Sequence, residues 1–209
     1  MYNGQLEENA VVGNQESIDL LIELLGSFER GRANLAKDIL LKAQKFSLEP
    51  LIGRLETAES QQMILNILKT LNQINTPTAY SSISQLVTHK NVIVRSRVYS
   101  ILIEKRDPNF MKDLSNRYEN LQHLSEKRAV VESILTLHDV EITNKIVPKV
   151  ILDLNSPKRE IREYVISKLK KIHTDESFNA LQSIQNDPDL KVQQLALKAI
   201  LHHKKMRNL

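Results

Sequence analysis

Apolar residues recur along this chain at the spacing of helical faces. In the stretch VRSRVYSIL, Val94, Val98 and Leu102 stand four residues apart, which places them on one face of a helix. Similar stretches recur at residues 127–135, 161–169 and 192–200. Each stretch predicts an amphipathic helix, which we name helix A of a repeat.

The same helical pattern returns at a nearly constant interval. Aligning the stretches produces a column of six apolar residues: Ala36, Ile67, Val98, Val131, Val165 and Ala196. A second column lies four residues further on: Leu40, Leu71, Leu102, Leu135, Leu169 and Ile200. The steps along the first column are 31, 31, 33, 34 and 31 residues. Such a period is the sequence signature of a repeat architecture.

A second helical pattern, helix B, follows each helix A after a short polar link. Phe110 and Leu114 mark the apolar face of one helix B, and Thr76 before Pro77 and Thr174 mark the starts of two others. A single pair of helices A and B cannot bury its inner face, whereas stacked pairs can. The chain is therefore predicted to be an all-α solenoid.

These patterns resemble HEAT repeats, and more closely the short bacterial kind also found in phycobilin lyases. The resemblance rests on turns with an acidic residue or Asn before Pro, a β-branched residue with Arg in helix A, and Pro in helix B, as in residues 48–55 and 145–152. It implies a right-handed α-solenoid of about six two-helix repeats with a period of 31–34 residues, forming one domain over residues 17–205. Residues 1–16 are then expected to be a flexible N-terminal tail, and residues 206–209 a C-terminal tail.

The resemblance also implies a structural role for the Arg of helix A. In HEAT repeats this Arg is a rung of a ladder that joins neighbouring repeats through a turn Asp and backbone carbonyls. The rungs in this sequence are Arg95, Arg128 and Arg162. The positions six residues earlier, where the family has Asp, hold His89, Gln122 and Ser156. We therefore expect a degraded ladder.

Composition narrows the class of protein. Five Gly and six Pro among 209 residues are few, which argues against a sandwich or barrel. No Cys occurs, which excludes a disulfide framework and thiolate zinc sites and fits a reducing compartment. The longest apolar runs are far shorter than the roughly 20 residues that span a bilayer. We expect a cytoplasmic protein with no membrane-spanning segment.

The charges are unevenly placed along the chain. Residues 1–30 hold one Arg and six acidic residues, a net charge of −5, whereas residues 145–209 hold thirteen Lys or Arg and seven acidic residues, a net charge of +6. The first predicted helix, residues 17–25, is largely apolar. We expect a domain or fragment of a larger protein or assembly, in which this N-terminal apolar helix docks on a neighbouring domain or subunit.

The sequence holds no motif of known chemistry. His202 and His203 are adjacent and point in different directions on a helix, so they are poorly placed to bind the same tetrahedral metal ion. No HExxH, GxSxG or Gly-rich phosphate loop occurs. We therefore predict a protein that is not an enzyme, with no catalytic, cofactor-binding or metal-binding residue and no cofactor.

A binding surface remains as the candidate site, because helices B line the concave face in solenoids of this kind. The non-core positions predicted to contact a partner are Arg54, Gln85, Lys112, Asn116, Arg117, Lys145 and Lys149. Four of them form a basic ridge: Lys112, Arg117, Lys145 and Lys149. The expected partner is a protein or an acidic peptide segment.

The leading prediction is thus a protein–protein interaction scaffold. One alternative is a HEAT-like enzyme of the phycobilin lyase or alkylpurine DNA glycosylase type, although the sequence has no Trp and only nine aromatic residues for base stacking. The other is a basic nucleic-acid-binding module. That module would place five lysines on one face: Lys145, Lys149, Lys168, Lys170 and Lys171.

Overall fold

The polypeptide folds into α-helices joined by short turns. The computed structural model describes residues 2–206, and no strand occurs among them. The α-helices in this range are α1 (Tyr2–Val11), α2 (Gln15–Leu24), α3 (Arg30–Lys42), α4 (Gln44–Thr57), α5 (Gln61–Ile74), α6 (Pro77–Ser84), α7 (Val92–Glu104), α8 (Pro108–Lys112), α9 (Leu114–Asn120), α10 (Leu124–Leu137), α11 (Val140–Leu152), α12 (Arg159–Leu169), α13 (Asp175–Ser183) and α14 (Leu190–Met206). Two 3₁₀ helices, η1 (Gln85–Thr88) and η2 (Asp153–Asn155), follow α6 and α11 directly.

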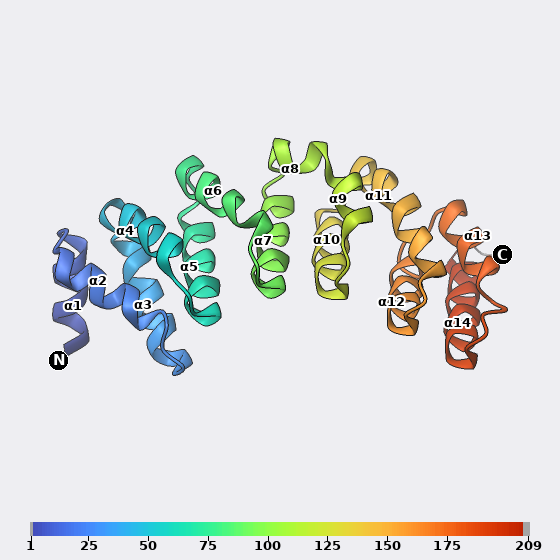
Figure 1. The fold of residues 1–209 in the computed structure, drawn as a ribbon, viewed down its shortest axis with the longest axis horizontal. Coiled ribbons are helices and arrows are strands. Elements are labelled where there is room, and N and C mark those ends of the chain that lie inside the picture. The colour runs from blue at the N-terminus through green and yellow to red at the C-terminus, as the bar shows by residue number, and fades with distance from the viewer. Residues whose placement is uncertain (1, 207–209) are drawn as a thin grey trace. The chain divides into compact units, whose positions relative to one another are not determined.

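The helices gather into two compact units. Unit 1 ends at Asp107 and unit 2 begins at Pro108. In each unit helices A and B alternate along the chain (Figure 1). The helices A are α3, α5 and α7 in unit 1 and α10, α12 and α14 in unit 2, and each contains one residue of the first apolar column. The chain is therefore an all-α solenoid, and the assignment of residues 17–205 to a single domain stays a prediction.

The two apolar columns lie in the cores of the units. All six residues of the first column are at most 2% exposed. In the second column five residues are buried and Leu135 is half-buried. On α10 its neighbour Ile134 is buried in its place. The period of the sequence is thus the period at which buried residues recur.

One core position holds a charged side chain. Four residues before the first column, α5, α7, α12 and α14 carry the buried apolar residues Met63, Val94, Ile161 and Val192, whereas α3 carries the exposed Arg32. At the equivalent position α10 carries Lys127, which is 7% exposed. A buried ammonium is costly unless it is paired.

Asp153 and Tyr118 satisfy this buried ammonium. Lys127 Nζ donates to Asp153 Oδ1 at 2.5 Å, and the Tyr118 hydroxyl donates to Asp153 Oδ2 at 2.7 Å. The ammonium also lies 5.0 Å from the centre of the Tyr118 ring. Because the three side chains come from three different elements of unit 2, this network ties α9, α10 and η2 together.

The N-terminal segment differs from the flexible tail expected for residues 1–16, because residues 2–11 form helix α1. Ala10 of this helix is fully buried, and Glu7 pairs with Lys42 of α3 at 2.5 Å. Gly13, at a positive φ of 89°, makes the turn into α2, where the Asn14 side chain accepts from Ser17 N at 2.9 Å. The charge pattern of residues 1–16 does not predict this helix, because the contacts that stabilise it are with residues distant in the sequence.

The predicted starts of two helices B have the expected caps. Thr76 Oγ1 accepts a hydrogen bond from Ala79 N at 3.2 Å at the start of α6. At the start of α13, Thr174 Oγ1 accepts from Ser177 N at 3.2 Å while Ser177 Oγ accepts from Thr174 N at 3.2 Å. Side chains that satisfy these first amides favour helix initiation there.

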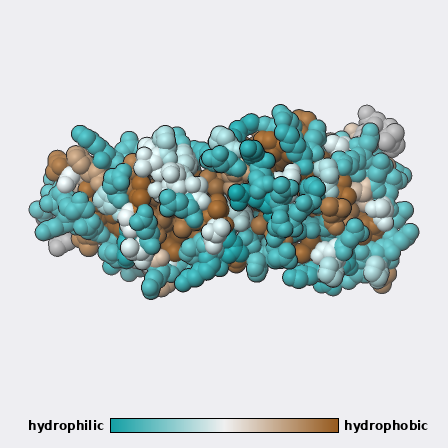
Figure 2. All heavy atoms as spheres, turned by 45° about the horizontal axis from the view of Figure 1, so that its top comes forward, coloured by the Kyte–Doolittle hydropathy of each residue, from teal (hydrophilic) through white to brown (hydrophobic). Residues whose placement is uncertain are grey.

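On the face shown in Figure 2 the surface is mostly hydrophilic, and apolar atoms reach it in separate places. Among the described residues no helix combines the length and the apolar character that crossing a bilayer requires. Helix α14 ends at Met206, so residues 207–209 of the predicted C-terminal tail lie outside the described residues.

Candidate functional site

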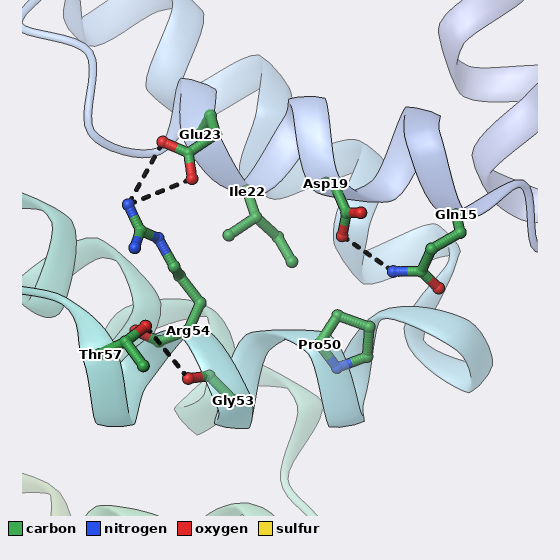
Figure 3. A pocket seen from close by; sticks show the side chains of 8 residues that line it. All are labelled: Gln15, Asp19, Ile22, Glu23, Pro50, Gly53, Arg54 and Thr57. Atoms are coloured by element: carbon green, nitrogen blue, oxygen red, sulfur yellow. Dashed lines mark hydrogen bonds and ion pairs between the residues drawn. The ribbon is translucent and has the colours of Figure 1, made fainter.

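A groove runs between α2 and α4 in unit 1, on two consecutive helices B. It has a volume of about 300 Å³ and is lined by Gln15, Asp19, Ile22, Glu23, Pro50, Gly53, Arg54 and Thr57. We name it the α2–α4 groove. Figure 3 shows Ile22 pointing from α2 toward α4, while Arg54 and Glu23 meet across the groove.

Two residues that usually interrupt helices keep the α4 side of the groove open. Pro50 lies inside α4, where it has no N–H to donate to the carbonyl of Phe46. Gly53 follows, and a Cβ built on it would meet no heavy atom within 4 Å. Because Gly53 has no side chain, the groove is open at this position.

The polar groups of the groove are arranged as one ion pair and one amide contact. Arg54 Nη2 lies 3.1 Å from Glu23 Oε1 and 3.3 Å from Glu23 Oε2, and Gln15 Nε2 donates to Asp19 Oδ1 at 2.8 Å. No described residue accepts a hydrogen bond from Arg54 Nε. The Glu23 side chain is 60% exposed, so this ion pair is held in water and is worth at most about 1 kcal/mol.

The predicted contact residues divide between the two units. Arg54 lines the α2–α4 groove, and Gln85 is exposed at the first position of η1, both in unit 1. The other five belong to unit 2: Lys112, Asn116, Arg117, Lys145 and Lys149.

Carboxylates neutralise most of the basic ridge in unit 2. Lys145 Nζ lies 2.7 Å from Glu141 Oε1, Arg117 Nε lies 3.9 Å from Asp113 Oδ2, and Lys149 pairs with Glu119. These three carboxylates leave a net charge of +1 on the four cations of the ridge. The ridge is therefore a mixed surface rather than a positive one.

Local contacts also hold two of the ridge residues in place. The hydrogen bond that Lys145 donates to Glu141, and the negative charge of Glu141, raise the pKa of Lys145. The Arg117 guanidinium lies 5.1 Å from the centre of the Phe110 ring. Nearby, Asn116 Nδ2 donates to Asp113 Oδ1 at 2.8 Å. Pairing keeps these side chains in fixed positions on the helices B.

The three ladder residues have different surroundings. Arg162 Nε and Nη2 donate to Asp187 Oδ2 and Oδ1 at 2.8 and 3.0 Å. Arg95 Nη1 donates to the carbonyls of His89 and Lys90 at 2.6 and 3.1 Å. In contrast, the exposed Arg128 lies over the ring of Tyr164, with 5.1 Å from its guanidinium carbon to the ring centre.

A backbone acceptor six residues before the ladder position recurs in three repeats. Arg95 donates to the carbonyl of His89, Arg162 donates to the carbonyl of Ser156 at 2.8 Å, and Gln193 donates to that of Asp187 at 2.7 Å. The last of these bonds comes from Gln193 Nε2. The carbonyl is present whatever the side chain, so the missing Asp of the family does not remove this bond.

Sequence reasoning missed Gln15, Asp19, Glu23 and Thr57 as neighbours of Arg54. A signal was available, because Glu23 and Arg54 are 31 residues apart, one period of the repeat. Opposite charges one period apart on two helices B are expected to meet, since successive repeats stack in register.

The described residues hold no group of three or more His, Asp or Glu side chains that could bind a metal ion. His173, His202 and His203 of unit 2 lie together, with ring centres of His173 and His203 5.1 Å apart. Burial and the nearby charges of Lys170, His173 and Lys205 lower the pKa of His202.

Similarity of this chain to known proteins is confined to solved structures. No protein-family model and no curated protein matches it. A designed armadillo repeat protein matches with a TM-score of 0.51 at 16% identity, over 95% of this chain and 98% of that one. An engineered protein matches with a TM-score of 0.51 at 14% identity, over 96% of this chain and 97% of that one. At these identities the similarity shows the fold alone, a helical repeat solenoid.

Proposed function

We propose that this chain is a non-enzymatic scaffold of HEAT-type repeats that binds an extended, carboxylate-bearing protein segment along its helices B. The observation that supports the proposal most directly is the α2–α4 groove, with Arg54 at its wall and no side chain at Gly53. We also propose a cytoplasmic location, because a sequence without Cys suits a reducing compartment.

The chemistry of Arg54 favours a carboxylate partner. A guanidinium presents five donors in a plane and binds a carboxylate through two of them. Arg54 uses Nη2 toward Glu23, and its side chain is 35% exposed, whereas its Nε is buried. An incoming carboxylate can therefore bind Arg54 while Glu23, which is largely exposed, turns to solvent.

The floor of the groove supports a peptide as the occupant. Ile22 and Pro50 supply apolar contact, and Gly53 leaves room for a partner side chain. Gln15 and Asp19 supply an amide and a carboxylate that can bind the main chain of an extended segment. A small apolar floor with a polar rim is the usual composition of a peptide-binding groove.

Two observations weigh against the alternative functions. A nucleic-acid-binding face made of Lys145, Lys149, Lys168, Lys170 and Lys171 loses one member, because Lys168 is buried and pairs with Glu132. Lys145 and Lys149 of the same face already pair with Glu141 and Glu119. For an enzyme, the groove offers open, solvated charges rather than buried groups that converge on one point.

A library of random peptides displayed on phage tests the proposal. Selection on the immobilised chain is expected to enrich peptides that share an acidic residue, and their affinity is then measured for four variants. Arg54→Glu is expected to weaken binding by about tenfold or more, since it replaces attraction with repulsion. Arg30→Glu, at the exposed start of α3 and outside the groove, is its matched control.

The two glycines form the second matched pair. Gly53→Met fills the groove, whereas Gly31→Met places the same side chain on α3, and a Cβ at either glycine meets nothing within 4 Å. Both variants are expected to fold, because Gly inside a helix is less favourable than most residues. Loss of peptide binding in Gly53→Met alone supports the groove. Enriched peptides that bind all four variants equally would rule it out.

A further inference from the structure

A pocket between α1, α2 and α3 lies on the side of α2 that faces away from the α2–α4 groove. It has a volume of about 470 Å³ and is lined by Leu6, Leu20, Leu21, Leu24, Arg32, Leu35, Ala36 and Ile39. Seven of these eight residues are apolar, and Leu20 and Leu35 remain 46% and 40% exposed. We name it the N-terminal pocket.

An apolar stripe runs along the outer face of α14 in unit 2. Leu190, Leu197 and Leu201 are 72%, 48% and 64% exposed. Their spacing of seven and four residues keeps them on one side of the helix. The opposite side of α14 packs on α12 and α13 through its buried residues Val192, Ala196, Ala199, Ile200 and His203. We name these three leucines the α14 stripe.

Charges of opposite sign flank the two apolar surfaces. Helix α14 contains four Lys and no acidic residue. Lys198, Lys204 and Lys205 lie within one turn of Leu201, and none of the three forms an ion pair with a described residue. This end of the stripe is therefore basic.

The α2 side of the N-terminal pocket carries one exposed carboxylate. Glu16 lies one turn before Leu20 on α2 and is exposed. The single cation in the lining, Arg32, is already paired with Glu29 at 2.8 Å. The other two acidic residues of α2, Asp19 and Glu23, line the α2–α4 groove instead. An apolar helix face with basic flanks is thus complementary to this pocket.

We propose that the N-terminal pocket of one molecule binds the α14 stripe of a second copy of this chain. The leucines of the stripe enter the apolar pocket, and a flanking lysine meets the exposed Glu16 of α2. Because the two surfaces differ, the contact is head-to-tail and each molecule keeps one free surface of each kind, so assembly continues beyond a dimer. This inference does not depend on the α2–α4 groove.

Sedimentation velocity over a range of protein concentrations is the first test. A contact made by one helix face lies at the weak end of protein interfaces, so we expect species larger than a dimer to appear at about 10–100 μM. Raising the salt concentration is expected to shift assembly to higher protein concentration, because the charged flanks are screened.

Two substitutions of exposed residues separate the surfaces. Leu20→Lys alters the pocket and Leu201→Glu alters the stripe, and each is expected to weaken self-association by about tenfold or more. Leu152→Glu on α11 is the matched control, since Leu152 is 56% exposed and lies on neither surface. Peptide binding in the groove should be unchanged in all three, which separates failure of this proposal from failure of the scaffold proposal.

Mixing the two altered chains gives the sharpest outcome. The Leu20→Lys chain retains an intact stripe and the Leu201→Glu chain retains an intact pocket, so together they are expected to form a one-to-one dimer and nothing larger. A protein that stays monomeric throughout this range, variants that assemble like the original chain, or a mixture that forms no dimer would each overturn the proposal.

Discussion

Arg162 on α12 holds Asp187, in the turn before α14, through two parallel hydrogen bonds of 2.8 and 3.0 Å. A third bond, from Arg162 Nη1 to the carbonyl of Ser156, measures 2.8 Å. The Arg162 and Asp187 side chains are only 12% and 3% exposed. This buried, bidentate pair joins consecutive repeats of unit 2, which leads to the first prediction.

Replacing Arg162 by Met is expected to lower the free energy of unfolding by about 3–5 kcal/mol, because it leaves the Asp187 carboxylate buried without its cation. Urea denaturation followed by circular dichroism measures the change. Arg159→Met is the control. Arg159 is 55% exposed and pairs with Glu163 and Asp189 at 3.2 and 3.6 Å, so its loss is expected to cost less than about 1 kcal/mol. Equal losses in the two variants would contradict the structural role of Arg162.

Lys127 supplies the second prediction. Lys127→Met places an apolar side chain where α5 already has Met63, yet it leaves Asp153 with the Tyr118 hydroxyl as its remaining partner. We expect a loss of about 3 kcal/mol in the free energy of unfolding. Adding Asp153→Asn removes the unpaired charge and keeps an acceptor for Tyr118, so the double variant should recover more than half of that loss. A double variant less stable than the single one would show that the charge of Asp153 has another role.

The third prediction concerns the free energy of unfolding at alkaline pH. Burial raises the pKa of Tyr118, and the carboxylate of Asp153 raises it further. Burial, with the charge of Glu132, also raises the pKa of Tyr164. A raised pKa means that the folded state holds these protons more tightly than the unfolded state does. The contribution of the two tyrosines to the free energy of unfolding is therefore complete below the unfolded pKa of about 10, and it is lost as the pH rises above that value.

The free energy of unfolding is therefore expected to fall between about pH 10 and 12, and less steeply in Tyr118→Phe. Urea denaturation at several pH values measures the slope. Parallel curves for the variant and the original chain would contradict a buried, protonated Tyr118.

The C-terminus of α10 supports the fourth prediction. His138 occupies the C-cap at φ 51° and is exposed, in the left-handed region that favours Gly. His138→Gly is expected to raise the free energy of unfolding by about 1 kcal/mol, since Gly adopts this conformation without a Cβ penalty. Lys170→Gly, at the C-cap of α12 with φ −54°, is the control and should give no gain. Thermal denaturation compares the two variants, and a gain in both would remove the explanation by backbone conformation.

The ladder illustrates how far a sequence pattern reaches. The resemblance to HEAT repeats and the Arg positions predict which helices carry a ladder Arg. The partner of each rung depends on the neighbouring repeat: Arg162 meets Asp187, whereas Arg128 lies over Tyr164. Asp187 occupies the turn position that His89, Gln122 and Ser156 hold in earlier repeats, and only the packing shows that it bonds Arg162 of the preceding repeat.

In the candidate site, too, the sequence predicts single residues and the packing decides their surroundings. Arg54 was predicted from its place on a helix B, yet the groove around it needs α2 and α4 packed side by side, with Gly53 facing open space. The basic ridge was predicted from the positions of its cationic residues alone. Its carboxylate partners, Asp113, Glu119 and Glu141, reduce that charge, and Glu119 comes from the preceding helix B, α9.

The sequence by itself determined the all-α class, the repeat period, the six helices A and the buried first column, from Ala36 to Ala196. These features follow from 3.6-residue periodicity and local capping, which act over a few residues. Only the tertiary structure decided that residues 2–11 form a helix, that Lys127 is buried beside Asp153, and which charges cancel. Each of these depends on distances between residues far apart in the chain, and such distances are set by packing rather than by local pattern.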